Sequence, residues 1–129
     1  MRERWRAKAR AAVRRYPELV RMEAELRSPS LIPNYNGMPG SSEATRKTEI
    51  LALRELPPND RRDLDAVRMA LQTIQRYRNA DDRYMVIDLV YWRRSHTIEG
   101  AALKVHISPE RAGEWDRDFI GLVDAYRRR

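Results

Sequence analysis

Hydrophobic positions recur at helical spacing along most of this chain, and the pattern predicts an all-α fold. Pro17 lies inside the first periodic stretch, residues 3–27, so we expect a kink or a break near residues 16–17. Two further helices are predicted over residues 43–56, ended by Pro57 and Pro58, and over residues 60–78, where Asp60 can serve as the N-cap. The apolar stripe of the first helix is heptad-like, and Glu23 interrupts it. The stripe consists of Trp5, Ala9, Ala12, Tyr16, Leu19 and Leu26.

Residues 28–42, SPSLIPNYNGMPGSS, have no periodicity and are rich in Pro, Gly, Ser and Asn. This stretch is longer than the connections that a compact domain normally uses between helices. We therefore predict a flexible linker that divides the chain into a basic N-terminal helix, residues 1–27, and a small helical domain, residues 43–129.

Residues 84–92, YMVIDLVYW, have a composition that would suit a β-strand. No second strand-like run is present to pair with it, and a lone strand is not stable. We interpret the stretch as a helix over residues 81–94 that is buried on most sides, with its aromatic residues in the core rather than stacked on bases.

Residues 97–119, TIEGAALKVHISPERAGEWDRDF, have the layout of a helix-turn-helix that extends to about residue 122. Thr97 is a hydroxyl N-cap for the first helix, and Ser108, followed by a proline and an acid, is one for the second. Two helices joined by so short a turn can set the second into a DNA major groove. An ordinary hairpin in a helical core would show the same periodicity, so both interpretations stay open. The two apolar stripes are Ile98, Ala101, Ala102 and Val105, then Ala112, Trp115, Phe119 and Leu122, with Ile107 plugging the turn.

Composition limits the chemistry that this chain can perform. The 129 residues correspond to about one domain, and the absence of cysteine excludes disulfides and thiolate metal sites. Two histidines are too few for a convincing metal cluster, and no apolar run approaches the roughly 18 residues of a membrane span. No catalytic motif for a hydrolase, metalloprotease, nucleotide or dinucleotide site appears. We expect a soluble cytoplasmic protein that is not an enzyme, has no cofactor and does not bind membranes.

The net charge of +7 indicates a polyanionic partner, and this excess lies wholly in residues 1–80. Residues 81–129 carry equal numbers of acidic and basic side chains. The N-terminal helix could be a solvated cover of the core, an arm that contacts phosphates, or an element of self-association into a homo-oligomer. Its basic residues are Arg2, Arg4, Arg6, Lys8, Arg10, Arg14 and Arg15.

Residues 84–122 resemble the C-terminal domain of phage transcriptional regulators of the RinA/ArpU type, a domain similar to the DNA-binding region 4 of sigma factors. The resemblance rests on the helix ending Tyr91-Trp92-Arg93-Arg94, on Thr97 and Glu99, on Ala102, on the segment Lys104-Val105-His106-Ile107-Ser108, and on Trp115 and Phe119. It extends weakly upstream to the Tyr-Pro pair at residues 16–17.

The resemblance implies a DNA-binding transcriptional regulator, an activator of late or packaging genes that works in a bacterial host and contacts double-stranded DNA and RNA polymerase. It implies base-reading roles for Glu110, Arg111, Glu114 and Arg117. It also implies phosphate contacts from Arg94, Thr97, Lys104 and Ser108. The family places Arg, Lys and Thr along this face, whereas three of this chain's four charged residues before Arg117, counting Asp116, are acids. Glutamate can accept a hydrogen bond from cytosine N4, although it repels phosphate.

Two other functions fit the same sequence. A small terminase-like DNA-packaging protein would also combine a helix-turn-helix with helical oligomerisation elements, and it would form a ring-sized oligomer. A helical adaptor would use the heptad-like N-terminal helix to bind protein and would not bind DNA duplexes even at about 50 mM salt, where phosphate attraction is strong.

Overall fold

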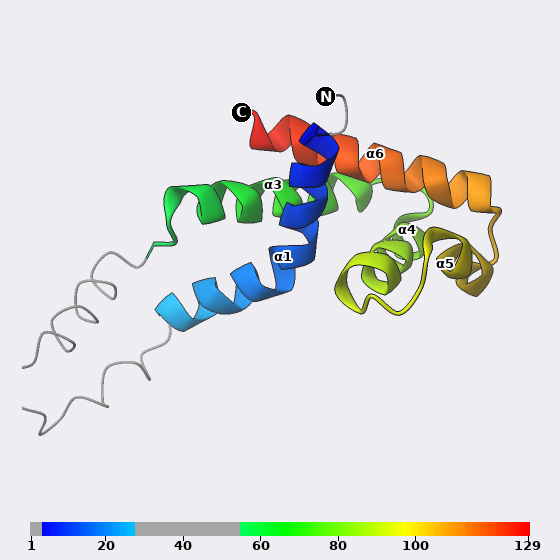
Figure 1. Ribbon diagram of the computed structural model, residues 1–129, viewed down its shortest axis with the longest axis horizontal. Coiled ribbons are helices and arrows are strands. Elements are labelled where there is room, and N and C mark those ends of the chain that lie inside the picture. The colour runs from blue at the N-terminus through cyan, green and yellow to red at the C-terminus, as the bar shows by residue number, and fades with distance from the viewer. Residues whose placement is uncertain (1–3, 28–54) are drawn as a thin grey trace, which may run out of the picture.

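The computed structural model describes residues 4–27 and 55–129, and this part of the chain is helical apart from short connections (Figure 1). The prediction of an all-α fold is confirmed. The predicted linker 28–42, all but the last two residues of the predicted helix 43–56, and Arg2 lie outside the described residues. The elements are α1 (Arg4–Arg27), α3 (Pro58–Ile74), α4 (Ala80–Ile87), the π-helix η3 (Asp88–Trp92), α5 (Ile98–Val105) and α6 (Pro109–Arg127).

Helices α1, α3 and α6 enclose the main core, with α1 crossing the other two (Figure 1). The apolar stripe of α1 faces inward, and Ala9, Ala12 and Val13 are fully buried. The N-terminal helix is thus part of the same core as residues 58–127. Of the three interpretations of this helix, the one in which it covers the core agrees with this packing. The other core residues are Ala66, Val67, Ala70, Leu71, Ile74, Ile87, Tyr91, Phe119, Ile120 and Val123.

Helix α1 stays continuous through Pro17 and bends near its middle, where the ribbon of Figure 1 changes direction. Because Pro17 has no N–H, the carbonyl of Val13 loses the donor that an α-helix would supply four residues later. The indole Nε1 of Trp92 in η3 donates to this carbonyl over 2.8 Å. The Tyr16 ring stacks on Trp92 with centroids 5.5 Å apart, so η3 stabilises the bend.

The predicted helix over residues 81–94 corresponds to α4 followed by η3. The wider π turn was not predicted, and it presents Tyr91 towards α6 and Trp92 towards α1. The expectation of burial on most sides is correct for Val86, Ile87, Leu89 and Tyr91. It is wrong for Tyr84 and Met85, which are exposed.

Helix α3 begins earlier and ends earlier than the sequence predicted. Its N-cap is Pro57 and its first residue is Pro58, because a proline at the first helical position has no N–H to leave unsatisfied. The prediction of Asp60 as the cap is wrong; Asp60 lies in the first turn, where it accepts a hydrogen bond from Arg15 over 2.9 Å. The predicted helix reached residue 78, with Tyr77 on its apolar face; because the helix ends at Ile74, Tyr77 lies beyond it and is exposed.

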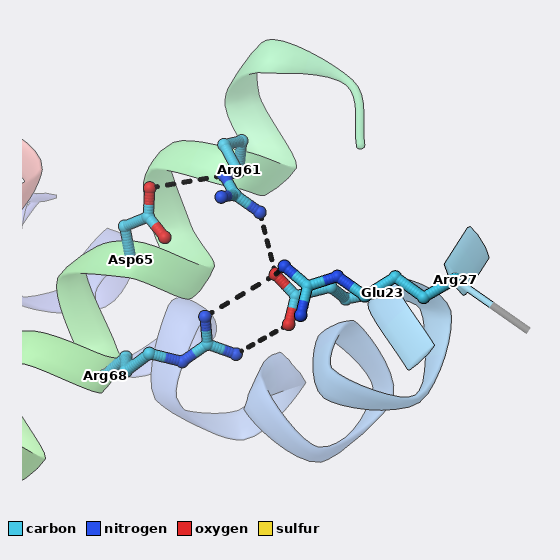
Figure 2. A network of polar contacts seen from close by, with 5 residues as sticks. All are labelled: Glu23, Arg27, Arg61, Asp65 and Arg68. Atoms are coloured by element: carbon cyan, nitrogen blue, oxygen red, sulfur yellow. Dashed lines mark hydrogen bonds and ion pairs between the residues drawn. The ribbon is translucent and has the colours of Figure 1, made fainter. Parts of the chain in front are cut away.

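A buried carboxylate joins the second half of α1 to α3. Glu23, which interrupts the apolar stripe, lies 2.7 Å from the Arg61 guanidinium and 2.8 Å from that of Arg68, with Arg27 at 3.8 Å (Figure 2). Hydrogen bonding to Arg68 is the main reason that the pKa of Glu23 lies below its ordinary value. The interruption is therefore an ion-pair cluster between two helices.

The bend in α1 can be tested by a double-mutant cycle. We expect Trp92→Phe to lower the free energy of unfolding by about 1–2 kcal/mol, because the buried Val13 carbonyl loses its donor. In a Pro17→Ala background residue 17 supplies an N–H, and the same change should cost about 1 kcal/mol less. Urea unfolding of the four proteins measures this difference. Equal costs in the two backgrounds would show that the Val13 hydrogen bond does not stabilise the bend.

The Glu23 cluster should make stability depend on pH. We expect Glu23→Gln to lower the free energy of unfolding by about 1–3 kcal/mol at pH 7. Because the folded-state pKa of Glu23 is lowered, its contribution is complete above its ordinary pKa of 4.5 and is lost as pH falls through the folded value. The difference between wild type and variant should therefore shrink below about pH 4.5. Exposed Glu25→Gln on the same helix is the matched control, and a difference that stays constant down to pH 3 would contradict the charge assignment.

Candidate nucleic-acid interface

Helices α5 and α6 are joined by residues 106–108, and both begin at the predicted caps. The Thr97 hydroxyl accepts the Gly100 N–H over 3.1 Å, and the Ser108 hydroxyl accepts the Arg111 N–H over 3.1 Å. Pro109 occupies the first position of α6, as predicted from its missing N–H. These caps define where the second helix starts and therefore which residues form its first turn.

The end of α5 is a Schellman motif, in which His106 takes the left-handed conformation with φ 62°. The Ile107 N–H bonds to the Ala102 carbonyl over 3.0 Å, and the His106 N–H bonds to the Leu103 carbonyl over 3.3 Å. Ile107 packs on the cluster around Ala101 and Trp115, as predicted for a plug in the turn. The turn is thus held by backbone bonds and one apolar side chain.

A second, smaller core lies between α4, η3, α5 and the first half of α6. It contains Val86, Leu89, Ala101 and Trp115. The Arg83 guanidinium lies 5.0 Å from the Trp115 ring centroid and 4.7 Å from that of Tyr77, so it links α4 to the first half of α6 and to the segment that follows α3. Of the predicted α6 stripe, Ala112, Trp115 and Phe119 are buried, and Leu122 is partly buried beside Val123.

The opposite side of the α6 N-terminal half carries the four residues assigned to base reading. Glu110, Arg111, Glu114 and Arg117 are all exposed. Gly113 lies at the edge of this face, where a Cβ would meet only the Arg117 guanidinium, at 3.5 Å. The exposed surface of the helix therefore offers two guanidinium groups and two carboxylates.

Asp116 does not belong to this exposed face, although the sequence analysis included it among the acids there. Its side chain turns inward, accepts a hydrogen bond from the Tyr91 hydroxyl and lies 3.6 Å from Arg10. Burial, with the hydrogen bond to Asp116, raises the pKa of Tyr91, which stays a protonated donor. Sequence reasoning missed this triad, because its members come from α1, η3 and α6.

The four residues assigned to phosphate contacts surround the same two helices, and all are exposed. Arg94 precedes α5 in the left-handed conformation, with φ 54°, and Lys104 lies in the last turn of α5. Thr97 and Ser108 use a lone pair of the hydroxyl in capping, which leaves the hydroxyl proton available to donate to an anion.

The residues of the N-terminal basic segment do not form one continuous arm. Arg10 pairs with Asp116, and Arg15 pairs with Asp60 at 2.9 Å, so both contribute to packing of the core helices. Arg14 lies 6.0 Å from the Tyr91 ring centroid, and Arg6 lies 5.1 Å from that of Trp5. Arg4 and Lys8 are exposed at the start of α1.

Comparison of the chain with protein-family models, with curated proteins and with solved structures gave no match. Within residues 4–27 and 55–129, no helix is long and apolar enough to cross a membrane. The same residues contain no group of three or more acidic, histidine or cysteine side chains that could hold a metal ion.

The left-handed cap of α5 yields a prediction about stability. We expect His106→Gly to raise the free energy of unfolding by about 1 kcal/mol, because glycine adopts a positive φ without the Cβ penalty. His106→Ala is the matched control, since alanine keeps the Cβ and should give no gain. Thermal unfolding of the three proteins measures the effect. An equal gain from alanine would mean that the histidine ring, and not the backbone conformation, is unfavourable.

Proposed function

We propose that α5 and α6 act as a helix-turn-helix and that the protein is a phage-type transcriptional regulator, an activator of late or packaging genes. The observation that carries the proposal is the division of the α6 N-terminal half. One side is buried against α4, η3 and α5 through Ala112 and Trp115, and the side that bears Arg111 is exposed. A helix mounted on a small core with one free polar face is what major-groove reading requires.

Each exposed residue has a role that follows from its chemistry. Arg111 and Arg117 can donate two hydrogen bonds to guanine O6 and N7, and Glu110 and Glu114 can accept from cytosine N4. Arg94 and Lys104 supply positive charge for phosphates, and the Thr97 and Ser108 hydroxyls are neutral donors to them. The two glutamates also repel the backbone, so this face alone gives weak binding that depends on the correct base sequence. Additional affinity would come from cations elsewhere on the chain or from contact with RNA polymerase.

The adaptor alternative relied on the heptad-like stripe of α1, and the terminase-like alternative needs a helical element for oligomerisation. Within the described residues that stripe contacts α3, η3 and α6 and is largely buried. The stripe is therefore not free to pair with a second copy or with another helix unless α1 leaves the core. This burial favours the regulator.

The regulator proposal predicts different effects from two substitutions. A duplex selected by the wild-type protein from a random-sequence library serves as the specific site. We expect Arg111→Ala to weaken binding to that duplex by about 1–3 kcal/mol and to leave binding to random duplexes nearly unchanged. Lys104→Ala should weaken both and lower the salt slope by about 1. Fluorescence anisotropy between 50 and 200 mM NaCl measures both effects.

Arg78→Ala, at an exposed residue between α3 and α4, is the control for loss of one charge. Equal losses on selected and random duplexes for Arg111→Ala would overturn its base-reading role. If wild type binds no duplex at about 50 mM salt, the adaptor is the better interpretation. A ring-sized oligomer in light scattering would favour the terminase-like protein.

A further inference from the structure

A cationic cleft lies where the start of α1 meets the end of α6, at the opposite end of α6 from the Arg111 face. Figure 1 shows the start of α1 beside the C-terminal turn of α6 and over α3. The cleft has a volume of about 670 Å³. Its described lining includes six basic residues from these three helices and from the two residues that follow α6: Arg4, Lys8, Arg62, Arg127, Arg128 and Arg129.

A buried carboxylate fixes one wall of this cationic cleft. Asp63 is 9% exposed and accepts a hydrogen bond from the Arg127 Nε over 2.8 Å, which joins α6 to α3. Arg62 and Arg15 also approach the Asp63 carboxylate, at 3.8 and 3.9 Å. Arg62 and Arg127 of the lining therefore lie at a junction of two core helices.

Acidic groups near the cationic cleft are too few to neutralise it. Among the described lining residues Asp124 is the only acid, and it lies 3.1 Å from Arg128. Arg4, Lys8, Arg62 and Arg129 are exposed. Like charges gathered in a concave surface raise the local positive potential, which attracts anions and disfavours the empty state. Asp63 and Asp124 offset part of this charge, and the remaining positive potential favours an anionic ligand.

The arginine content of the lining favours a nucleic acid over an acidic protein. Trp5 is the only apolar residue among the described lining. Five of the six cations are arginines, whose planar guanidinium pairs with phosphate oxygens in two-pronged fashion. The volume exceeds the needs of a single phosphate, and the cations come from three directions.

We propose that this cleft binds the phosphodiester backbone of double-stranded DNA without sequence preference. The site is separate from the reading face, since Arg111 and Arg127 are about 24 Å apart along α6 at 1.5 Å per residue. That separation is about twice the width of the major groove. The cleft therefore contacts a different stretch of backbone from the one that faces Arg111. It does not depend on the regulator function.

The test uses the full chain and a 20-base-pair duplex of random sequence. The cleft variant combines Lys8→Gln, Arg62→Gln and Arg129→Gln, which leaves the Arg127–Asp63 and Arg128–Asp124 pairs in place. The matched control combines Arg21→Gln, Arg76→Gln and Arg78→Gln, three exposed residues outside the cleft. Anisotropy between 50 and 200 mM NaCl gives the affinity and its salt slope. Circular dichroism establishes that each variant is folded.

We expect the cleft variant to lose about tenfold or more in affinity at 50 mM salt and about 2–3 from the salt slope. The control should lose much less. The same loss should appear when Arg111→Gln and Arg117→Gln are already present. Equal losses in cleft variant and control would overturn the proposal. The proposal would also fail if the cleft variant lost as much affinity for a poly-glutamate 20-mer as for the duplex, because the cleft would then be a general polyanion site. If the reading-face changes affect no duplex while the cleft changes do, the regulator function fails and the cleft remains.

Discussion

The hydrogen bond from Trp92 to the Val13 carbonyl is the contact on which the arrangement of these helices depends. Pro17 removes the donor that this carbonyl would otherwise have, and a buried carbonyl without a donor is unfavourable. The π turn of η3 supplies the replacement from a segment 79 residues further along the chain. With the bend stabilised, the first half of α1 packs against α6 and the second half follows α3, where Glu23 engages Arg61 and Arg68.

Helix α6 belongs to both cores along its length. Its second half, with Phe119, Ile120 and Val123, is buried in the main core. Its first half rests on the smaller core through Trp115 and leaves the Arg111 side exposed. Because one continuous helix spans both regions, the orientation of the exposed face is set by packing some 15 Å away along the axis. On the function that we propose, this mounting would present the polar groups of α6 to a DNA groove in a fixed orientation.

The two exposed regions at the ends of α6 differ in charge. The exposed face of α6 is mixed, with two arginines and two glutamates, whereas the cationic cleft at the other end is strongly positive. Several basic residues that a count along the sequence would place in one arm, Arg10 and Arg15 among them, neutralise partly buried carboxylates instead. The net charge of the chain therefore overstates what the N-terminal helix offers to a polyanion. The regulator and the cleft that we propose divide selectivity and non-specific attraction between opposite ends of one helix.

The sequence by itself determined the local features: helical periodicity, the caps at Thr97 and Ser108, the plug at Ile107 and the inward stripe of Ala112, Trp115 and Phe119. These depend on contacts within a few residues, where side-chain spacing and hydroxyl or proline chemistry decide the outcome. It misplaced the start of α3 and left Asp116 on the wrong side of α6. Only the tertiary structure decided the partners of Val13, Asp116 and Glu23 and brought Arg62 and Arg127 beside Lys8. Those pairings join residues far apart along the chain, and no local pattern encodes which buried polar group will face which.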